Sequence, residues 1–375
     1  MNTQLDMVKH KRRLSGILVH PTSLPGKFGI GDLGPEAYHF VDFLKEAGQH
    51  IWQTLPLGPT GETNCPYQCY SSFAGQPLLI SPELLVKDGL LTEEDLSSPP
   101  AFPEEKVDYA LVKQYKGELF HKAFSRFTDP ASADFADLHD SFASFRQESF
   151  WLADYSMFMA IKKSKKGIHW LDWEKKYRKP TKSQKTVIAR ELETEIAYEE
   201  FLQWLFFRQW AALKTYANEQ GILLIGDLPI FVAGDSADVW AQPKLFQLDQ
   251  DGFPTVVAGV PPDYFSSTGQ LWGNPLYDWK YHKKTDFDWW MKRIQVQLSL
   301  SDIIRIDHFR GLESYWEVPA NAKNALNGRW ADGPKDASLH RLKPFSAKIF
   351  RSSQKIWALS LTKCGPSETA MVFRA

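Results

Sequence analysis

The segment 303–311 places an arginine and an aspartate where they could act together in a reaction. It reads Ile-Ile-Arg-Ile-Asp-His-Phe-Arg-Gly, so a strand-like apolar run leads into charged residues and a glycine turn. Because strand side chains alternate between faces, Arg305 and Asp307 should share one face and the isoleucines the other. A neighbouring guanidinium favours the ionised carboxylate, which suits Asp307 to act as a nucleophile. The alternative is a buried structural ion pair at the end of a strand.

A second carboxylate, Asp227, follows the fully apolar run 222–225. Cleavage of a glycosidic bond with retention requires a nucleophilic carboxylate and a carboxylic acid about 5–5.5 Å apart. Asp307 fits the first role, and we expect Asp227 to bind a substrate hydroxyl or to hold Arg305. The structural alternative for Asp227 is a cap on the turn that follows it.

Two polar segments carry aromatic residues that could contact a sugar. The segment 258–272 is too polar and turn-rich to be core, yet it contains large aromatic residues. Such residues on an exposed loop usually mark a binding surface, so we expect a lid or a platform for a glucan chain, although an ordinary surface loop remains the alternative. A second loop, after the predicted strand 51–57, carries Tyr67. The candidate residues of the longer segment are Asp263, Tyr264, Phe265 and Trp272.

Predicted strands and helices alternate along the stretches that carry these residues, as is typical of βαβ units. The predicted strands are 14–19, 51–57, 222–225 and the one that ends at Asp307; the predicted helices are 34–48, 191–220 and 289–298. Polar residues at the carboxyl ends of parallel strands match the active-site face of a (β/α)8 TIM barrel. The competing architecture is a doubly wound sheet, but no glycine-rich phosphate loop follows a strand.

We divide the chain into four segments on this basis. Residues 1–76 begin the barrel with its first two strands, and residues 77–190 form a mainly helical insertion. Residues 191–336 continue the barrel with strands three and four and include a substrate loop at 250–275. We expect the barrel to be truncated after its fourth strand, because residues 337–375 do not continue the pattern.

Composition excludes several classes of protein. The 375 residues are 43% apolar and carry a net charge of −1, which indicates a globular chain without the basic stripe of a nucleic-acid binder. No apolar run has the length of a membrane span, and no secretory signal is visible, so the expected location is the cytoplasm. Cys65, Cys69 and Cys364 match neither a disulfide framework nor a metal site and are expected to be free thiols. The 14 tryptophans suit sugar binding, although large rings also fill cores.

Six motifs together resemble those of the amylomaltases, the 4-α-glucanotransferases or disproportionating enzymes of glycoside hydrolase family 77. The resemblance extends from about residue 15 to residue 334. The motifs are His20-Pro-Thr-Ser-Leu-Pro25, Pro66-Tyr-Gln68, Gly226-Asp-Leu-Pro-Ile-Phe-Val232, Gly259-Val-Pro-Pro-Asp-Tyr-Phe265, Leu271-Trp-Gly-Asn-Pro-Leu276 and Arg305-Ile-Asp-His-Phe-Arg-Gly311.

This resemblance implies an activity and a set of site residues. The implied reaction transfers an α-1,4-glucan segment between malto-oligosaccharides through a covalent glycosyl-enzyme. Asp307 would be the nucleophile with Arg305 beside it, and Asp227 would lie in the −1 subsite. No metal or organic cofactor is implied, and the expected partners are α-1,4-glucans, not nucleic acid or membranes. The implied substrate contacts are Tyr67, Asp227, Asp263, Tyr264, Phe265, Trp272, Asn274 and His308.

The sequence departs from the family pattern in its last part. The family's acid/base glutamate belongs to a Glu-Asp-Leu-Gly motif, and a further aspartate follows a later strand; neither motif occurs here. If the codons of 354–357 are read from their third base, however, they allow Glu-Asp-Leu-Gly, since the single codon of Trp357 forces the glycine. We therefore expect 337–375 to be an out-of-frame product, against the alternative of a divergent natural segment.

Without its general acid, this exact chain is expected to be inactive. A barrel cut after its fourth strand leaves strand edges unpaired and its apolar interior open, so the chain is also expected to be poorly soluble. Two other functions stay open at this point. One is a catalytically dead glucan-binding protein that keeps the aromatic platform. The other is an α-amylase-type glycoside hydrolase, against which the long loop 259–273 and the insertion after the second strand argue.

Overall fold

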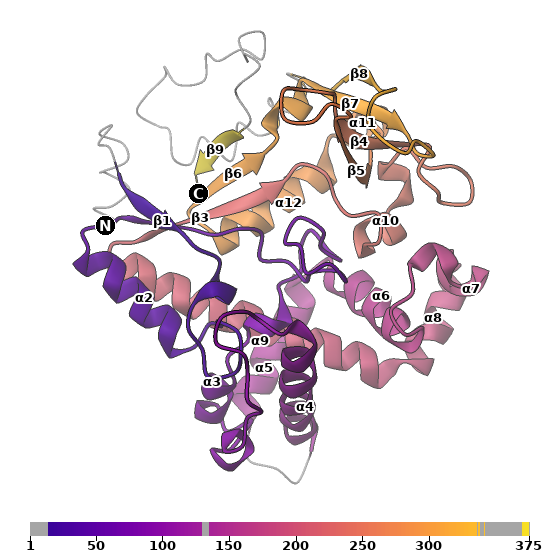
Figure 1. Ribbon diagram of the computed structural model, residues 1–375. Helices are drawn as coiled ribbons and strands as arrows, with labels where there is room; N and C mark the ends of the chain where they lie inside the picture. The colour runs from indigo at the N-terminus through magenta and orange to yellow at the C-terminus, as the bar shows by residue number, and fades with distance from the viewer. Residues whose placement is uncertain (1–13, 130–134, 336, 338–340, 342–369, 375) are drawn as a thin grey trace. The chain divides into compact units, whose positions relative to one another are not determined.

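The structure is a computed structural model that describes residues 14–129, 135–335, 337, 341 and 370–374 (Figure 1). The chain divides into two compact units. Unit 1 comprises residues 1–59, 74–160 and 188–225, and unit 2 comprises residues 60–73, 161–187 and 226–375. No helix among the described residues is long and apolar enough to cross a membrane.

Unit 1 is built from short parallel strands and long helices. Strand β1 (Gly16–Leu18) pairs in parallel with β2 (Ile51–Gln53), and β2 pairs in parallel with the first part of β3 (Leu223–Pro229). Trp52 is fully buried between its neighbours. Gly16 permits the close approach of β1, because a Cβ there would lie 2.3 Å from the Ile51 carbonyl oxygen.

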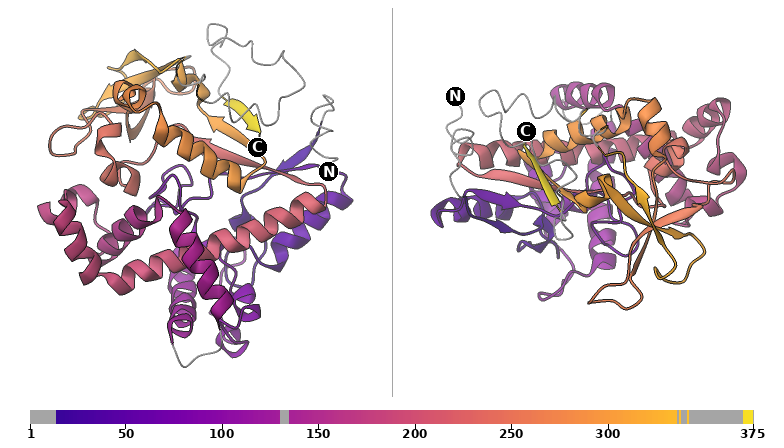
Figure 2. Two further views of the ribbon diagram at one scale, coloured as in Figure 1. Left: turned by 180° about the vertical axis from the view of Figure 1, so that it is seen from behind. Right: turned by 90° about the horizontal axis from the view of Figure 1, so that it is seen from above.

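The helices of unit 1 surround its longest helix, α9 (Glu193–Glu219), which runs alongside α2 (Pro35–Glu46; Figure 2). The hydroxyl of Tyr216 on α9 donates to Asp42 on α2 at 2.5 Å. Every element described between Pro77 and Glu191 is helical, and these elements are divided between the two units, since 161–187 belongs to unit 2. These elements are η2 (Pro77–Leu79), α3 (Pro82–Lys87), η3 (Glu94–Leu96), α4 (Tyr109–Thr128), α5 (Ala136–Glu148), α6 (Leu152–Ser164), η4 (Trp170–Asp172), α7 (Lys175–Arg178) and α8 (Lys182–Glu191), with η1 (Pro21–Ser23) earlier in the chain.

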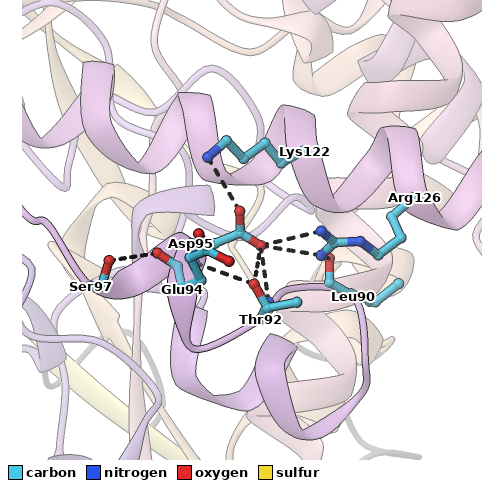
Figure 3. Close-up of polar contacts among 7 residues, drawn as sticks. All are labelled: Leu90, Thr92, Glu94, Asp95, Ser97, Lys122 and Arg126. Carbon is cyan, nitrogen blue, oxygen red and sulfur yellow. Dashed lines mark hydrogen bonds and ion pairs between the residues drawn. The ribbon is translucent and has the colours of Figure 1, made fainter.

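A polar cluster attaches the segment before α4 to that helix (Figure 3). Asp95 accepts hydrogen bonds from Lys122 at 3.2 Å and from Arg126 at 3.3 Å, both on α4. Arg126 also donates to the carbonyl oxygen of Leu90 at 2.8 Å. In unit 2 a second arginine, Arg293, also donates to backbone carbonyl oxygens.

Unit 2 contains the second part of β3, whose neighbour is β6 (Ile303–Asp307), and a separate antiparallel sheet. That sheet has the strand order β5 (Gln270–Pro275), β4 (Val256–Val260), β7 (Ser314–Pro319) and β8 (Arg329–Asp332). Strand β9 (Ala370–Arg374) pairs antiparallel with β6. The remaining elements are α10 (Ala237–Ala241), η5 (Pro243–Leu245), α11 (Trp279–Lys284), α12 (Asp288–Leu300) and η6 (Phe309–Leu312).

The structure confirms the predicted α/β class and all four predicted strands, together with the helices predicted at 34–48, 191–220 and 289–298. The segment boundaries stay a prediction, because each unit combines stretches from several of the predicted segments. Most of 337–375, including Cys364, lies outside the described residues.

Two local predictions were wrong. Asp227 does not end its strand, since β3 continues to Pro229, where the missing N–H stops the ladder. The segment 258–272 is not a loop throughout: its ends belong to β4 and β5, which form an antiparallel pair. Gly259, Gly273 and Pro275 concealed this sheet, because glycine and proline normally argue against strands.

Candidate active site

Arg305 bridges two carboxylates at the carboxyl end of the strand pair β3 and β6. Its Nη1 donates to Asp227 Oδ1 at 2.7 Å, and its Nη2 donates to Asp307 Oδ1 at 2.6 Å. The predicted alternation is confirmed, because Ile304 and Ile306 are fully buried on the opposite face. Charge-assisted bonds from one planar guanidinium hold both carboxylates in a defined orientation.

Asp227 and Asp307 differ in how many hydrogen bonds they accept from protein side chains. Asp227 is buried, and its second oxygen accepts a hydrogen bond from the Tyr67 hydroxyl at 2.7 Å. Burial raises the pKa of Asp227, while the Tyr67 hydrogen bond and Arg305 oppose that rise. The Asp307 side chain is 35% exposed and lines a pocket. Asp307 is therefore the carboxylate that a ligand can reach.

A pocket of about 390 Å³ opens beside Asp307, entirely within unit 2. It is lined by Cys65, Tyr67, Gln68, Pro229, Ile230, Phe231, Leu271, Trp272, Asn274, Asp307 and His308. These residues come from the loop after β2, the carboxyl end of β3, β5 and the end of β6. Its volume lies within the range of small-molecule sites.

Three rings form one wall of the pocket. The Trp272 ring meets His308 edge-on, with centroids 4.9 Å apart, and Phe231 lies 6.4 Å from His308 and 6.5 Å from Trp272. His308 has a left-handed backbone (φ 51°), a conformation that non-glycine residues adopt mainly where the surrounding structure requires it. Burial lowers the pKa of His308 and so favours its neutral imidazole. A face of rings beside carboxylates suits the apolar faces and hydroxyls of a sugar.

Asn274 lies at the pocket with its amide bonded to protein groups. Its Nδ2 donates to the Val232 carbonyl oxygen at 2.8 Å, and its Oδ1 accepts from Gln68 Nε2 at 3.5 Å. Asn274 thereby connects the loop that carries Tyr67 to the chain that follows β3. Its direct role toward a substrate stays a prediction.

The remaining predicted contacts lie at the tip of the β4–β5 hairpin. Tyr264 and Phe265 are 101% and 95% exposed. The Asp263 carboxylate accepts from the backbone N–H groups of Phe265 and Ser266, both at 2.8 Å, and so shapes the tip. None of these three predicted residues is part of the pocket lining described above.

Sequence reasoning missed several lining residues, of which Phe231 and Gln68 contribute most to the geometry. Both residues belong to the quoted motifs, in which Phe231 follows Ile230 and Gln68 follows Tyr67. Their membership of these motifs could therefore have identified them as candidate site residues. Neither Cys65 nor Cys69 forms a disulfide bond among the described residues; the Cys69 thiol donates to the Pro66 carbonyl oxygen at 3.0 Å, and Cys65 lines the pocket. Among the described residues, no group of three or more histidine, cysteine, aspartate or glutamate side chains could hold a metal ion.

An α/β fold with paired carboxylates at a ring-lined pocket is compatible with a glycoside hydrolase, and comparison with known proteins shows the family. The model of glycoside hydrolase family 77, described as 4-alpha-glucanotransferase, matches residues 19–358, and the chain belongs to that family. This confirms the resemblance found in the motifs. The match extends beyond residue 334, where the motif resemblance stops.

Curated relatives and solved structures agree with this assignment. The chain is 51% identical over 327 residues to the 4-alpha-glucanotransferase of Synechocystis sp., covering 86% of this chain and 64% of the relative. It is 48% identical over 338 residues to that of Thermus thermophilus, covering 90% of this chain and 66% of the relative. The chain thus spans about two thirds of the length of the relatives it matches.

Among solved structures, the amylomaltase from Streptococcus agalactiae in complex with acarbose matches with a TM-score of 0.83 and 40% identity, over 89% of this chain and 67% of that one. The amylomaltase from Corynebacterium glutamicum, at 17% identity over 88% of this chain and 45% of that one, shares the fold with a TM-score of 0.67.

Proposed function

We propose that this chain carries the glucan-binding and nucleophile-bearing part of a 4-α-glucanotransferase. The observation that supports it best is the Arg305 bridge, which presents Asp307 at a pocket walled by aromatic rings. Relatives at 48–51% identity carry the name of this activity. The substrates would be malto-oligosaccharides and α-1,4-glucans.

In the proposed reaction, an Asp307 carboxylate oxygen attacks the anomeric carbon of a bound glucan. The bond from that carbon to the glycosidic oxygen breaks, and the departing glucan needs a proton from a general acid. The 4-hydroxyl of a second glucan then attacks the anomeric carbon and gives its proton to the conjugate base of that general acid, while the bond from the carbon to Asp307 breaks and releases the carboxylate. Arg305 would orient the Asp307 carboxylate for attack, since its Nη2 donates to Asp307 Oδ1 at 2.6 Å.

The other residues would bind and orient the sugar. Tyr67, Asp227 and His308 would contact hydroxyls near the reacting carbon, and Asn274 would support that arrangement. Trp272 would stack on a sugar ring, and the exposed pair Tyr264 and Phe265 would receive the glucan farther from the reacting bond. Asp263 would hold this pair through its backbone contacts.

The acid/base glutamate expected in Glu-Asp-Leu-Gly does not occur in the sequence. We propose that 337–375 is read out of frame and that this exact chain binds glucans without transferring them. That glutamate's absence also favours a second candidate, a natural glucan-binding protein without turnover. Restoring the reading frame distinguishes the two, because only the first would then transfer.

Binding is tested by titrating the chain with acarbose and with maltoheptaose in a calorimeter. We expect saturable binding that Trp272→Ala weakens by about 1–2 kcal/mol, since truncating an aromatic residue at the centre of a binding site commonly costs more than about 1 kcal/mol. Phe253→Ala is the control, since it removes an exposed ring remote from the pocket lining. Absence of saturable binding to either ligand would refute the proposal.

Transfer is tested with maltotriose. A frame-restored chain should produce glucose together with longer glucans, whereas a hydrolase would produce only shorter sugars. Asp307→Asn in the frame-restored chain should abolish transfer. It should also prevent the covalent glycosyl-enzyme from forming. Disproportionation by the 375-residue chain itself would contradict the predicted loss of activity.

A further inference from the structure

Behind the pocket wall, unit 2 buries an arginine that bonds to the protein backbone. Arg293 on α12 is 2% exposed. Its Nη2 donates to the carbonyl oxygen of Pro229 at 2.6 Å, and its Nη1 donates to that of Ile230 at 3.1 Å. The same Nη1 lies 3.2 Å from the hydroxyl oxygen of Tyr277. The forked guanidinium thus grips two consecutive carbonyls.

The two carbonyls belong to Pro229, the last residue of β3, and to Ile230, the residue after it. Pro229, Ile230 and Phe231 all line the pocket. Tyr277 reinforces the grip, because its hydroxyl donates to the Ile230 carbonyl oxygen at 2.7 Å. Two residues after Ile230, the Val232 carbonyl oxygen accepts a hydrogen bond from Asn274 Nδ2. Side-chain donors therefore replace the strand ladder in the stretch that forms the pocket wall.

A backbone that leaves a sheet inside the protein needs such donors, since buried carbonyls are costly to leave unpaired. A neutral side chain could satisfy one carbonyl, but a guanidinium satisfies two in a fixed relative orientation. The planar fork therefore determines the direction of the chain at Ile230, and with it the direction of the next side chain, Phe231.

The surroundings of Arg293 support a role in geometry. Its guanidinium carbon lies 5.4 Å and 5.1 Å from the ring centroids of Trp289 and Trp290, within the range of cation–π contacts. Buried ions are poor stabilisers compared with apolar residues of similar volume. The buried carboxylate Asp238 accepts a hydrogen bond from the Ser72 backbone at 2.8 Å, in the loop that also carries Tyr67.

We propose that Arg293 is a positioning residue of the glucan site. Its guanidinium holds the Pro229–Ile230 carbonyls, and this places the Phe231 ring against Trp272 and His308 and aligns Asp227 with Arg305. The inference rests on the proposed function, in that the pocket it shapes is taken to be the glucan pocket. Arg293 is not among the residues that line the pocket.

The main test compares Arg293→Lys with the unmodified chain, because lysine keeps the cation and loses the fork. We expect amide hydrogen exchange to accelerate at residues 227–232 and to stay unchanged in unit 1. Acarbose affinity should fall at least about tenfold, in line with the sensitivity of sites to small misplacements. Tyr277→Phe, which removes only one donor, should shift both quantities in the same direction by less; it also serves if Arg293→Lys fails to fold.

Arg126→Lys is the matched control. Arg126 also donates to a backbone carbonyl oxygen, that of Leu90, but it lies in unit 1 (Figure 3). It should leave both acarbose affinity and exchange at 227–232 unchanged. A double-mutant cycle adds a readout that a general loss of stability would not move. If Arg293 acts through Phe231, the affinity loss caused by Arg293→Lys should shrink in a Phe231→Ala background.

Unchanged exchange at 227–232 in Arg293→Lys would overturn the inference, whatever the ligand. Accelerated exchange with unaltered acarbose affinity would overturn it as well. If the unmodified chain fails to bind acarbose, the proposed function fails, and the exchange measurement still decides whether Arg293 holds the end of β3.

Discussion

At the scale of single residues, the site depends on how Asp227 is paired. Both of its oxygens accept hydrogen bonds, one from Tyr67 and one from Arg305. This leaves Asp307 as the accessible carboxylate and explains why two aspartates on neighbouring strands can have different roles. The division follows from burial: an enclosed carboxylate needs every donor that the protein supplies, whereas a half-exposed one can exchange water for a substrate.

Tyr67→Phe removes the donor to Asp227 Oδ2. We expect the free energy of unfolding to fall by about 1–3 kcal/mol, because a buried acceptor loses its partner. Urea denaturation measures this change. Tyr264→Phe deletes the same hydroxyl from a fully exposed ring and should leave stability unchanged. Equal losses in the two variants would contradict the proposed pairing of Asp227.

His282 predicts a pH dependence of stability. It is fully buried, its Nε2 lies 3.2 Å from the Leu245 carbonyl oxygen, and burial lowers its pKa from 6.5 to about 4. Between pH 4 and pH 6.5, the His282 imidazole is mostly protonated in the unfolded chain and mostly neutral in the folded chain. Its contribution is therefore complete above pH 6.5 and is lost as the pH falls toward 4.

A His282 pKa lowered from 6.5 to about 4 corresponds to about 3 kcal/mol of unfolding free energy. His282→Gln should flatten the dependence of the unfolding free energy on pH by that amount, since glutamine does not titrate. His39→Gln alters an exposed histidine and serves as the control. A variant curve parallel to that of the unmodified chain would show that His282 does not govern this dependence.

At the scale of elements, the antiparallel sheet carries Trp272 to the pocket. β4 and β5 pair closely at Gly259, where a Cβ would lie 2.6 Å from the Gln270 carbonyl oxygen and 3.1 Å from Val318. Ala325 and Val257 complete the small core beneath this hairpin. The hairpin is therefore held by backbone proximity that only glycine allows.

Gly259→Ala should destabilise the chain by about 1–3 kcal/mol, as overpacking does, and should also weaken acarbose binding because β5 carries Trp272. Denaturation and calorimetry measure the two effects. Gly117→Ala provides the contrast: Gly117 lies within α4 with open space around it, so alanine should stabilise by about 1 kcal/mol without altering binding. The hairpin argument fails if Gly259→Ala binds acarbose as tightly as the unmodified chain.

At the scale of the whole molecule, the proposed reading-frame change governs activity. A single-base change near codon 336 should restore Glu-Asp-Leu-Gly over 354–357. The restored chain should transfer maltotriose at least about 10²–10⁴ times faster than the 375-residue chain, the usual contribution of general acid catalysis. Sequencing the gene across codons 330–375 provides the direct check. If no single-base change there recovers the motif, 337–375 is a natural segment and the proposal is wrong.

The sequence by itself determined the family, the parallel strands and the pairing of Arg305 with Asp307. These follow from local rules, since apolar runs specify buried strands and alternation specifies faces. The motifs also identified Tyr67 and Trp272 as neighbours of the site, although they lie far apart along the chain.

Only the tertiary structure showed that Tyr67 and Arg305 share Asp227, that 256–275 folds as a hairpin, and that Arg293 holds the end of β3. Each of these is a contact between residues separated by many positions, often to a backbone carbonyl that has no signature in the sequence. Such contacts depend on which strand ends and side chains are brought together by the tertiary fold. Local sequence patterns do not specify them.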